Sequence, residues 1–516
     1  MNQTDLITRL AAGEAFGGKP PERIDTHISV IFLTDDRAYK LKRAIRTSYL
    51  DYTSIEARKY GSEREVALNS RTAPELYIRA VAVTLSPQGR LAIGGDRTPI
   101  DWLVEMKRFN PRETLDILAA GNRLEDTLLR PLADQCAEMH RSARVIDGTD
   151  FPATIAGIIS GNRTELAAAG KAVFGINEID GLISRQEHAF LELKSAMEHR
   201  AARHHIRECH GDLHLGNICL VDGRPTIFDA IEFNESFNEI DTFYDLAFLL
   251  MDLMAQNDRR TASLLFNRYL FRISDYDELR VLPFYQSLRA TIRAHVLAKS
   301  ASQTNDGTKR ETLVERARHY FDTASDLLKE APVRIIAIGG YSGTGKSTLA
   351  NRIAPWLGAS PGAVVLSSDL TRKRLFSAEP ENRLDPQFYR PEASDRVYRE
   401  LLDCAGRTVG GGATVILDAT FTHAESRDEI EKLAATHGVD FHGYWLVGDA
   451  ENLARRVAER PQGASDATVD VLRQQLEQGS GEIDWRQIDT TDASIDAGDL
   501  VRRDLGLIDI SADDAT

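Results

Sequence analysis

The stretch Gly340-Tyr341-Ser342-Gly343-Thr344-Gly345-Lys346-Ser347 decides the fold of the second half of the chain. It matches the pattern G-x-x-x-x-G-K-[ST], and the apolar run 333–338 before it is typical of a buried parallel strand. Glycines let backbone N–H groups close around phosphates, and the N-terminus of a following helix adds a favourable field. The residues expected to hold a nucleotide here are Gly340, Ser342, Gly343, Thr344, Gly345, Lys346, Ser347 and Thr348.

Two acidic residues end the next predicted strands. Asp369 follows the run 364–368, and Asp418 follows the run 414–417. Because the carboxyl ends of parallel strands meet at one crevice, both carboxylates are expected beside the glycine-rich turn. There Lys346 can reach a transferring phosphoryl group, Ser347 and Asp418 can hold Mg²⁺, and Asp369 can take a proton from a hydroxyl. For each Asp the alternative is a helix cap or a turn residue.

Three arginines are further candidate site residues of the second half. Arg372 lies three residues after Asp369 and is expected to hold an anionic or hydroxyl-bearing acceptor. Arg456 and Arg460 lie four apart on one face of a predicted helix, ahead of the flexible run 462–466. Paired arginines on a mobile segment suit a phosphoryl transition state, whose charge spreads over several oxygens. The alternative is a solvated basic face.

Strands and helices alternate from residue 333 to about 459, which predicts a parallel sheet with helices on both faces. Pro332 ends the preceding helical stretch, so we expect a P-loop kinase domain over 333–516. This part resembles the small P-loop kinases grouped with polynucleotide kinase, zeta toxins, chloramphenicol phosphotransferase and gluconate kinase. The resemblance implies that Asp369 and Arg372 form the Asp-x-x-Arg pair in which the Asp activates the acceptor hydroxyl. It also implies that Arg456 and Arg460 are lid arginines.

The first half contains a second motif, His210-Gly211-Asp212-Leu213-His214-Leu215-Gly216-Asn217. It fits His-x-Asp-x-x-x-x-Asn, and Asp229 follows in Ile227-Phe228-Asp229. A kinase needs an Asp near the acceptor hydroxyl, together with an Asn and a second Asp for Mg²⁺. We therefore expect Asp212 to be the base and Asn217 and Asp229 to be metal ligands. The alternative is a polar turn among short strands.

Upstream residues complete this second constellation. Lys40 lies on the second strand of a hairpin predicted from the runs 27–33 and 37–42. Glu65 lies on the helix predicted next, over 55–69, as the Glu of a kinase Lys–Glu pair would. Lys42 shares the strand face of Lys40, so both remain candidates, with Lys40 preferred. The segment 102–107 is interpreted as the connector between two lobes, where the backbone at Glu105 could bind adenine.

Residues 24 to about 300 resemble the aminoglycoside phosphotransferase and choline kinase superfamily. The resemblance implies a bilobal protein-kinase-like fold over 1–325, with Asp245 as the buried anchor of the catalytic loop. The turn 34–36 departs from the pattern because it has no glycine to cover phosphates. An acidic cluster downstream is interpreted as a solvated loop, with attraction of a cationic acceptor as the alternative; it comprises Glu232, Glu235, Glu239 and Asp241. The order of both modules resembles bacterial fused proteins of this composition.

The composition limits the possible classes of protein. A content of 42% hydrophobic and 27% charged residues is typical of a globular protein, and no apolar run approaches the length of a membrane span. A net charge of −15 disfavours nucleic acid as a partner. Four cysteines without metal-like spacing are expected to be reduced, which favours the cytoplasm.

Together the sequence predicts a two-domain chain, α+β in front and α/β behind, with two phosphotransferase sites. The leading hypothesis is a bifunctional kinase that uses ATP or GTP with Mg²⁺ on hydroxyls of small molecules. A second hypothesis makes the acceptor a 5′-hydroxyl of RNA or DNA. In a third, one half only senses a nucleotide.

Overall fold

A computed structural model describes residues 1–47, 50–121, 123–169, 171, 173–256, 258–459, 465–491 and 496–507. The chain forms two compact units, one of Met1–Ile155 with Glu198–Asp252 and one of Ala156–Met197 with Leu253–Thr516. The predicted boundary near Pro332 lies inside the second unit and stays a prediction. Among the described helices, none has both the length and the apolar composition that a bilayer span requires.

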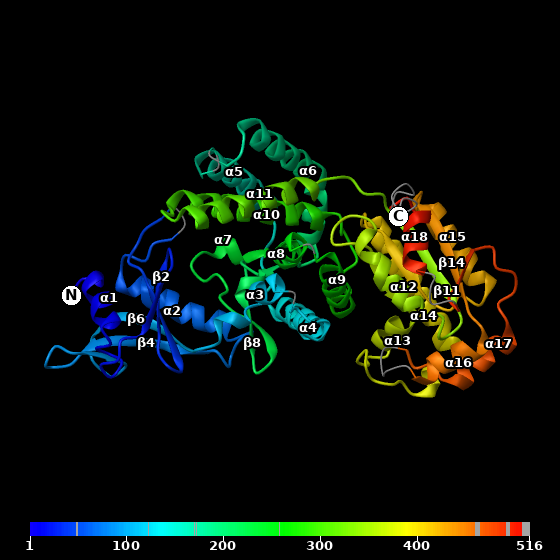
Figure 1. Ribbon diagram of the computed structural model, residues 1–516, viewed down its shortest axis with the longest axis horizontal. Helices are drawn as coiled ribbons and strands as arrows, with labels where there is room; N and C mark the ends of the chain where they lie inside the picture. The colour runs from blue at the N-terminus through cyan, green and yellow to red at the C-terminus, as the bar shows by residue number, and fades with distance from the viewer. Residues whose placement is uncertain are drawn as a thin grey trace. The chain divides into compact units, whose positions relative to one another are not determined.

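The first unit begins with a six-stranded sheet of order β1-β2-β3-β6-β4-β5 (Figure 1). Its strands are β1 (Glu22–Asp25), β2 (Ser29–Leu33), β3 (Arg37–Lys42), β4 (Tyr77–Leu85), β5 (Leu91–Ile93) and β6 (Pro99–Lys107). Helices α1 (Gln3–Ala11) and α2 (Ile55–Asn69) accompany the sheet, and α2 begins at Ser54, whose side chain accepts from the backbone N–H of Ala57. The predicted hairpin and the helix 55–69 are confirmed.

Short strands and helices make up the rest of the first unit. The helices are α3 (Leu115–Ala120), α4 (Asp126–Ser142), α7 (Glu235–Asn238) and α8 (Thr242–Ala255), of which α8 runs on beyond Asp252. The strands form two antiparallel pairs, β7 (Ile206–Glu208) with β10 (Glu239–Asp241) and β8 (Ile218–Val221) with β9 (Arg224–Ile227). Arg200 ties this region together, because its guanidinium, almost completely buried, makes two hydrogen bonds to the Asp241 carboxylate.

The second unit contains long helices and a parallel sheet. The long helices are α5 (Phe151–Ala169), α6 (Ile176–Ala202), α9 (Arg259–Ile273), α10 (Val281–Gln303) and α11 (Gly307–Asp326), with the first turn of α5 and the end of α6 in the first unit. Gln186 of α6 donates to Ser287 and Thr291 of α10, which satisfies buried hydroxyls between these helices.

The sheet has five parallel strands in the order β12-β13-β11-β14-β15. They are β11 (Arg334–Gly340), β12 (Val364–Ser367), β13 (Val415–Asp418), β14 (Asp440–Val447) and β15 (Arg486–Asp489). One face packs on α12 (Lys346–Ile353) and α18 (Ala497–Asp504), through apolar side chains that include Ile336, Ile338 and Val501. Helices α14 (Pro391–Gly410) and α15 (Ala424–His437) pack on strands of the same sheet (Figure 1).

The described part of the second unit also contains the helices α13 (Ser368–Leu375), α16 (Ala450–Glu459) and α17 (Val469–Gln478). The fold class expected from the sequence is confirmed. One detail is wrong: residues 102–107 are not a connector but part of β6, which is paired on both sides, with β3 and with β4. The chain leaves the sheet only after Lys107.

Candidate active sites

The glycine-rich turn lies between the central strand β11 and the N-terminus of α12, as its pattern predicts. Gly343 has a φ of 88°, a left-handed conformation that side chains rarely adopt. A Cβ atom at this position would also approach the backbone oxygen of Leu453 to 2.9 Å. The backbone therefore requires glycine at position 343.

Lys346, Ser347 and Asp418 lie together at the carboxyl ends of β11 and β13. The Lys346 ammonium donates to the carbonyls of Gly340 and Tyr341, each at 2.9 Å. The Ser347 hydroxyl donates to the Asp418 carboxylate at 2.5 Å. Burial raises the pKa of Asp418, an effect that the nearby Lys346 opposes. The structure thus brings together the two residues predicted to hold Mg²⁺.

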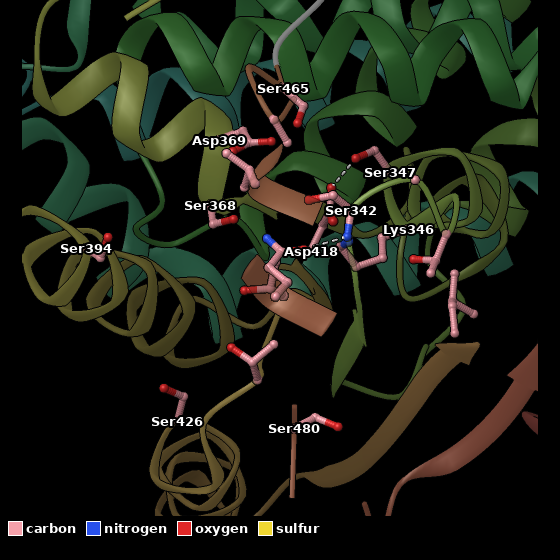
Figure 2. A pocket seen from close by; sticks show the side chains of 18 of the residues that line it. Ser342, Lys346, Ser347, Ser368, Asp369, Ser394, Asp418, Ser426, Ser465 and Ser480 are labelled. Carbon is pink, nitrogen blue, oxygen red and sulfur yellow. Dashed lines mark hydrogen bonds between the residues drawn. The ribbon is translucent and has the colours of Figure 1, made fainter. Parts of the chain in front are cut away.

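Asp369 lies in the first turn of α13, next to the same pocket (Figure 2). The cavity measures about 2020 Å³ and is lined by the whole turn 342–348, by Asp369 and Arg372, and by Asp418. Within the described residues, the Asp369 carboxylate has neither a hydrogen-bond partner nor an ion-pair partner. It is therefore available to a hydroxyl in the cavity.

Arg372 is 7% exposed, although it lines this cavity. Its guanidinium donates to the Phe388 carbonyl at 2.6 Å and lies 4.8 Å from the centre of the Tyr389 ring. In the described part of the chain, its Nε has no hydrogen-bond partner. Burial lowers the pKa of this arginine, an effect that the nearby Asp369 carboxylate opposes.

The two arginines predicted to act as lid residues have different outcomes. Arg456 lines the cavity and donates to the backbone oxygen of Thr490 at 2.7 Å, just after β15. Its predicted contact with the transferring phosphoryl group stays a prediction. Arg460 lies outside the described residues.

Three residues of this site, Tyr389, Asp466 and Gln475, were missed by the sequence interpretation. Asp466 accepts from the Tyr389 hydroxyl at 2.6 Å, and Gln475 accepts from the backbone N–H of Ser342 at 2.9 Å. All three side chains come from segments without a motif, and their partners lie far away in the sequence. The Asp within the polar run 462–466 was the sole available signal.

In the first unit, the buried carboxylate of Asp245 bonds to the backbone of the predicted catalytic loop. Its carboxylate accepts from the backbone N–H groups of His210 and Gly211 at 3.0 and 2.8 Å, and from His140 at 3.0 Å. The expected anchor role of Asp245 is confirmed. Both carboxylate oxygens of Asp245 accept these hydrogen bonds. The backbone at the beginning of the loop that carries Asp212 is therefore held in one conformation.

Asp212 and Asn217 are in direct contact. The Asn217 amide donates to the Asp212 carboxylate and to its backbone oxygen, both at 3.0 Å. The backbone N–H of Phe228 donates to the backbone oxygen of Asn217 at 3.0 Å, and this bond places the next residue, Asp229, beside the loop. The three residues predicted for base and metal are therefore brought to one place.

Both candidate lysines contact Glu65, which is completely buried in α2. Lys40 Nζ lies 2.9 Å from Glu65 and 2.6 Å from Asp229. Lys42 Nζ lies 2.6 Å from Glu65 and also contacts Glu232. The two lysines hold the pKa of Glu65 below its ordinary value, against the effect of burial. Lys40 alone of the two contacts a predicted metal ligand, which favours it for phosphate binding.

One prediction about this site requires correction, and one stays untested. The acidic cluster is not a solvated loop throughout, because Glu232 and Asp241 are buried and paired with Lys42 and Arg200. The side chain of Glu105 pairs with Arg79 at 2.8 Å, and its backbone belongs to β6. An adenine contact at Glu105 stays a prediction.

Relatives of known sequence extend over both halves. The Uncharacterized protein Rv2004c of Mycobacterium tuberculosis is 32% identical over 463 residues, which span 87% of this chain and 88% of that protein. This chain belongs to the Rv2004c family. The Uncharacterized protein Mb2027c of Mycobacterium bovis matches the chain over the same 463 residues with the same identity.

The C-terminal part of this Rv2004c family member matches a family model described as an AAA domain over residues 335–480. Among solved structures, a choline/ethanolamine kinase family protein from Mesorhizobium loti has a TM-score of 0.37 and 12% identity, covering 63% of this chain and 99% of that one. A sugar kinase from Janibacter sp. has a TM-score of 0.26 and 21% identity, covering 35% and 96%. The match to an AAA domain agrees with the P-loop domain expected over 333–516.

Proposed function

We propose that the chain is a bifunctional phosphotransferase, in which each half transfers the γ-phosphoryl group of ATP or GTP to a hydroxyl of a small molecule. One observation carries the proposal: each half brings together a lysine, a pair of oxygen-bearing side chains and a further carboxylate, which are the residue types that a kinase uses for phosphates, Mg²⁺ and the acceptor hydroxyl. In the first half these are Lys40, Asn217 with Asp229, and Asp212. In the second half they are Lys346, Ser347 with Asp418, and Asp369.

The second half fits a nucleotide with Mg²⁺. The Lys346 ammonium is bonded to carbonyls of its own loop, which a phosphate oxygen can replace. The Ser347 hydroxyl and the Asp418 carboxylate are hard oxygen ligands of the kind that Mg²⁺ prefers. When bound, Mg²⁺ would neutralise charge on the phosphate oxygens.

Asp369 would then take the proton of the acceptor hydroxyl. A bond forms between the acceptor oxygen and the γ-phosphorus, and the bond from that phosphorus to the β–γ bridging oxygen breaks, which leaves the nucleoside diphosphate. The environment of Arg372 indicates which charge the acceptor carries. A buried guanidinium without a carboxylate partner among the described residues favours an anionic group on the acceptor.

The first half fits the same chemistry through other residues. The Asn217 amide nitrogen is used on Asp212, so its amide oxygen is the atom left for a cation. Asp229 supplies a carboxylate whose side chain is 42% exposed. Asp212, at 38% exposure, would take the proton of this half's acceptor hydroxyl.

The test uses radiolabelled ATP and a metabolite pool from a bacterial extract, with product separation by chromatography. Asp212→Asn and Asp369→Asn should each remove a different set of labelled products, while the exposed Asp96→Asn and Asp428→Asn serve as controls. If neither variant changes the products of the wild type, the base assignments are wrong. Label on an added DNA or RNA oligonucleotide would instead support the 5′-hydroxyl hypothesis.

A further inference from the structure

Asp466 lies between α16 and α17 and has a buried carboxylate with three partners. Its side chain is 8% exposed and accepts from Lys373 at 3.1 Å, from the backbone N–H of Leu384 at 3.0 Å and from the Tyr389 hydroxyl at 2.6 Å. The partners belong to α13 and to the segment that joins α13 to α14. One carboxylate therefore ties two separate stretches of the second half together.

The contacts continue from Tyr389 into the acceptor side of the cavity. The guanidinium of Arg372 stacks on the Tyr389 ring and donates to the carbonyl of Phe388. Arg372 lies on α13, three residues after Asp369. The position of Tyr389 thus decides where the cation beside Asp369 can lie.

Lys373 strengthens the same link. It is completely buried, and its ammonium also donates to the backbone oxygens of Pro380 and Asn382. Among the described residues, Asp466 is its ion-pair partner, and no second carboxylate pairs with it. Because these bonds fix both ends of 380–384, the segment that leads to Tyr389 has a defined conformation.

The element that follows Asp466 also contacts the glycine-rich turn. Thr468 caps α17, and Gln475 of this helix accepts from the backbone N–H of Ser342. Leu472 packs with Leu453 and Val457 of α16, against Tyr341. The stretch 466–475 therefore contacts the donor side and the acceptor side of one cavity.

We propose that Asp466 is a positioning residue of the second active site, which holds Tyr389, and through it Arg372, in place for the acceptor. The inference rests on the proposed function of this site. If Asp466 has this role, binding of the acceptor depends on its carboxylate, whereas binding of the nucleotide does not. Because α17 bonds to the turn through Gln475, the nucleotide side keeps its own contact when the Asp466 carboxylate is removed.

Asp466→Asn and Tyr389→Phe test the proposal in an Asp212→Asn background, where only the second site transfers phosphate. Tyr389→Phe keeps the ring beneath Arg372 and removes only the hydroxyl bond. Asp470→Asn is the matched control, because this carboxylate of α17 is 84% exposed. The measurements are label transfer from ATP to the metabolite pool at increasing pool concentration, KM for ATP, and hydrogen exchange of the peptide that contains Leu384.

Each variant should raise the half-saturating pool concentration about tenfold, the size of one lost hydrogen bond to a charged group, with KM for ATP unchanged. The double variant should show no more than either single variant, since both break one link. Exchange at Leu384 should accelerate in Asp466→Asn, and Asp466→Glu should restore part of the pool affinity. If the half-saturating pool concentration does not change, or if KM for ATP rises by the same factor, this inference is wrong while the proposed function still stands. Absence of any transfer by the parent protein overturns the proposed function, and this inference with it.

Discussion

Replacing Lys42 and Lys40 separately by Met should distinguish a structural lysine from a phosphate-binding one. Both side chains leave the same face of β3 and both contact Glu65. They differ in their second partner and in burial. Lys42 is 1% exposed and contacts Glu232, which is 4% exposed, whereas Lys40 is 12% exposed and contacts the half-exposed Asp229.

The expected losses of stability follow from these partners. Lys42→Met leaves Glu232 buried without its cation, and breaking such a buried pair costs about 3–5 kcal/mol. The Tyr52 hydroxyl, which donates to Glu232 at 2.9 Å, offsets only part of that cost. Lys40→Met leaves Glu65 paired with Lys42, and water can solvate Asp229, so the loss should be about 1 kcal/mol.

Activity should follow the opposite order. In a Lys346→Ala background, which isolates the first site, Lys40→Met should lower label transfer at least about 100-fold, the effect of losing one charged contact to the transition state. Urea denaturation followed by circular dichroism, with hydrogen exchange on the α2 peptide, gives the stabilities. The interpretation is refuted if Lys40→Met destabilises the protein as much as Lys42→Met, or if it leaves transfer intact at temperatures where both variants are folded.

Two further predictions concern Mg²⁺ and pH. Ser347→Ala should raise the Mg²⁺ concentration needed for half-maximal transfer at the second site about tenfold, without changing that of the first site; titration of Mg²⁺ in the Asp212→Asn and Asp369→Asn backgrounds measures both. Burial lowers the pKa of the half-buried His295 to about 4. The folded state then binds fewer protons than the unfolded state below about pH 6.5, so stability should fall as the pH drops from 7 to 5, by at most about 2 kcal/mol. His295→Gln should remove this loss, and urea midpoints at both pH values test it.

Local signals in the sequence were enough to predict the elements that carry the chemistry. The glycine-rich turn, the strand before it and the helix after it form one continuous stretch, and each part favours the same structure. The same holds for α2, whose predicted ends at Ile55 and Asn69 agree with the structure. Asp418 ends β13, and Asp369 follows the end of β12 in the first turn of α13. Both were found because the carboxyl ends of neighbouring parallel strands meet at one edge.

Contacts between distant segments could not be predicted in this way. Glu232 and Asp241 occur in an acidic stretch that resembles a solvated loop, and only Lys42 and Arg200, far away in sequence, explain their burial. The segment 102–107 was misinterpreted for a related reason. Its residues suit a strand, but the partners on both sides, β3 and β4, decide that it lies inside the sheet.

The two lysines that define the sites are held in different ways, and this difference links the predictions above. Lys346 is bonded to neutral carbonyls of its own turn, so a phosphate oxygen replaces a weaker acceptor. Lys40 is bonded to two carboxylates, one of which is the predicted metal ligand Asp229. For Lys40 to contact a phosphate, the charge of Asp229 must be balanced by another cation. Nucleotide binding at the first site should therefore depend on its metal ligands more strongly than binding at the second, where the backbone N–H groups of the turn provide much of the interaction.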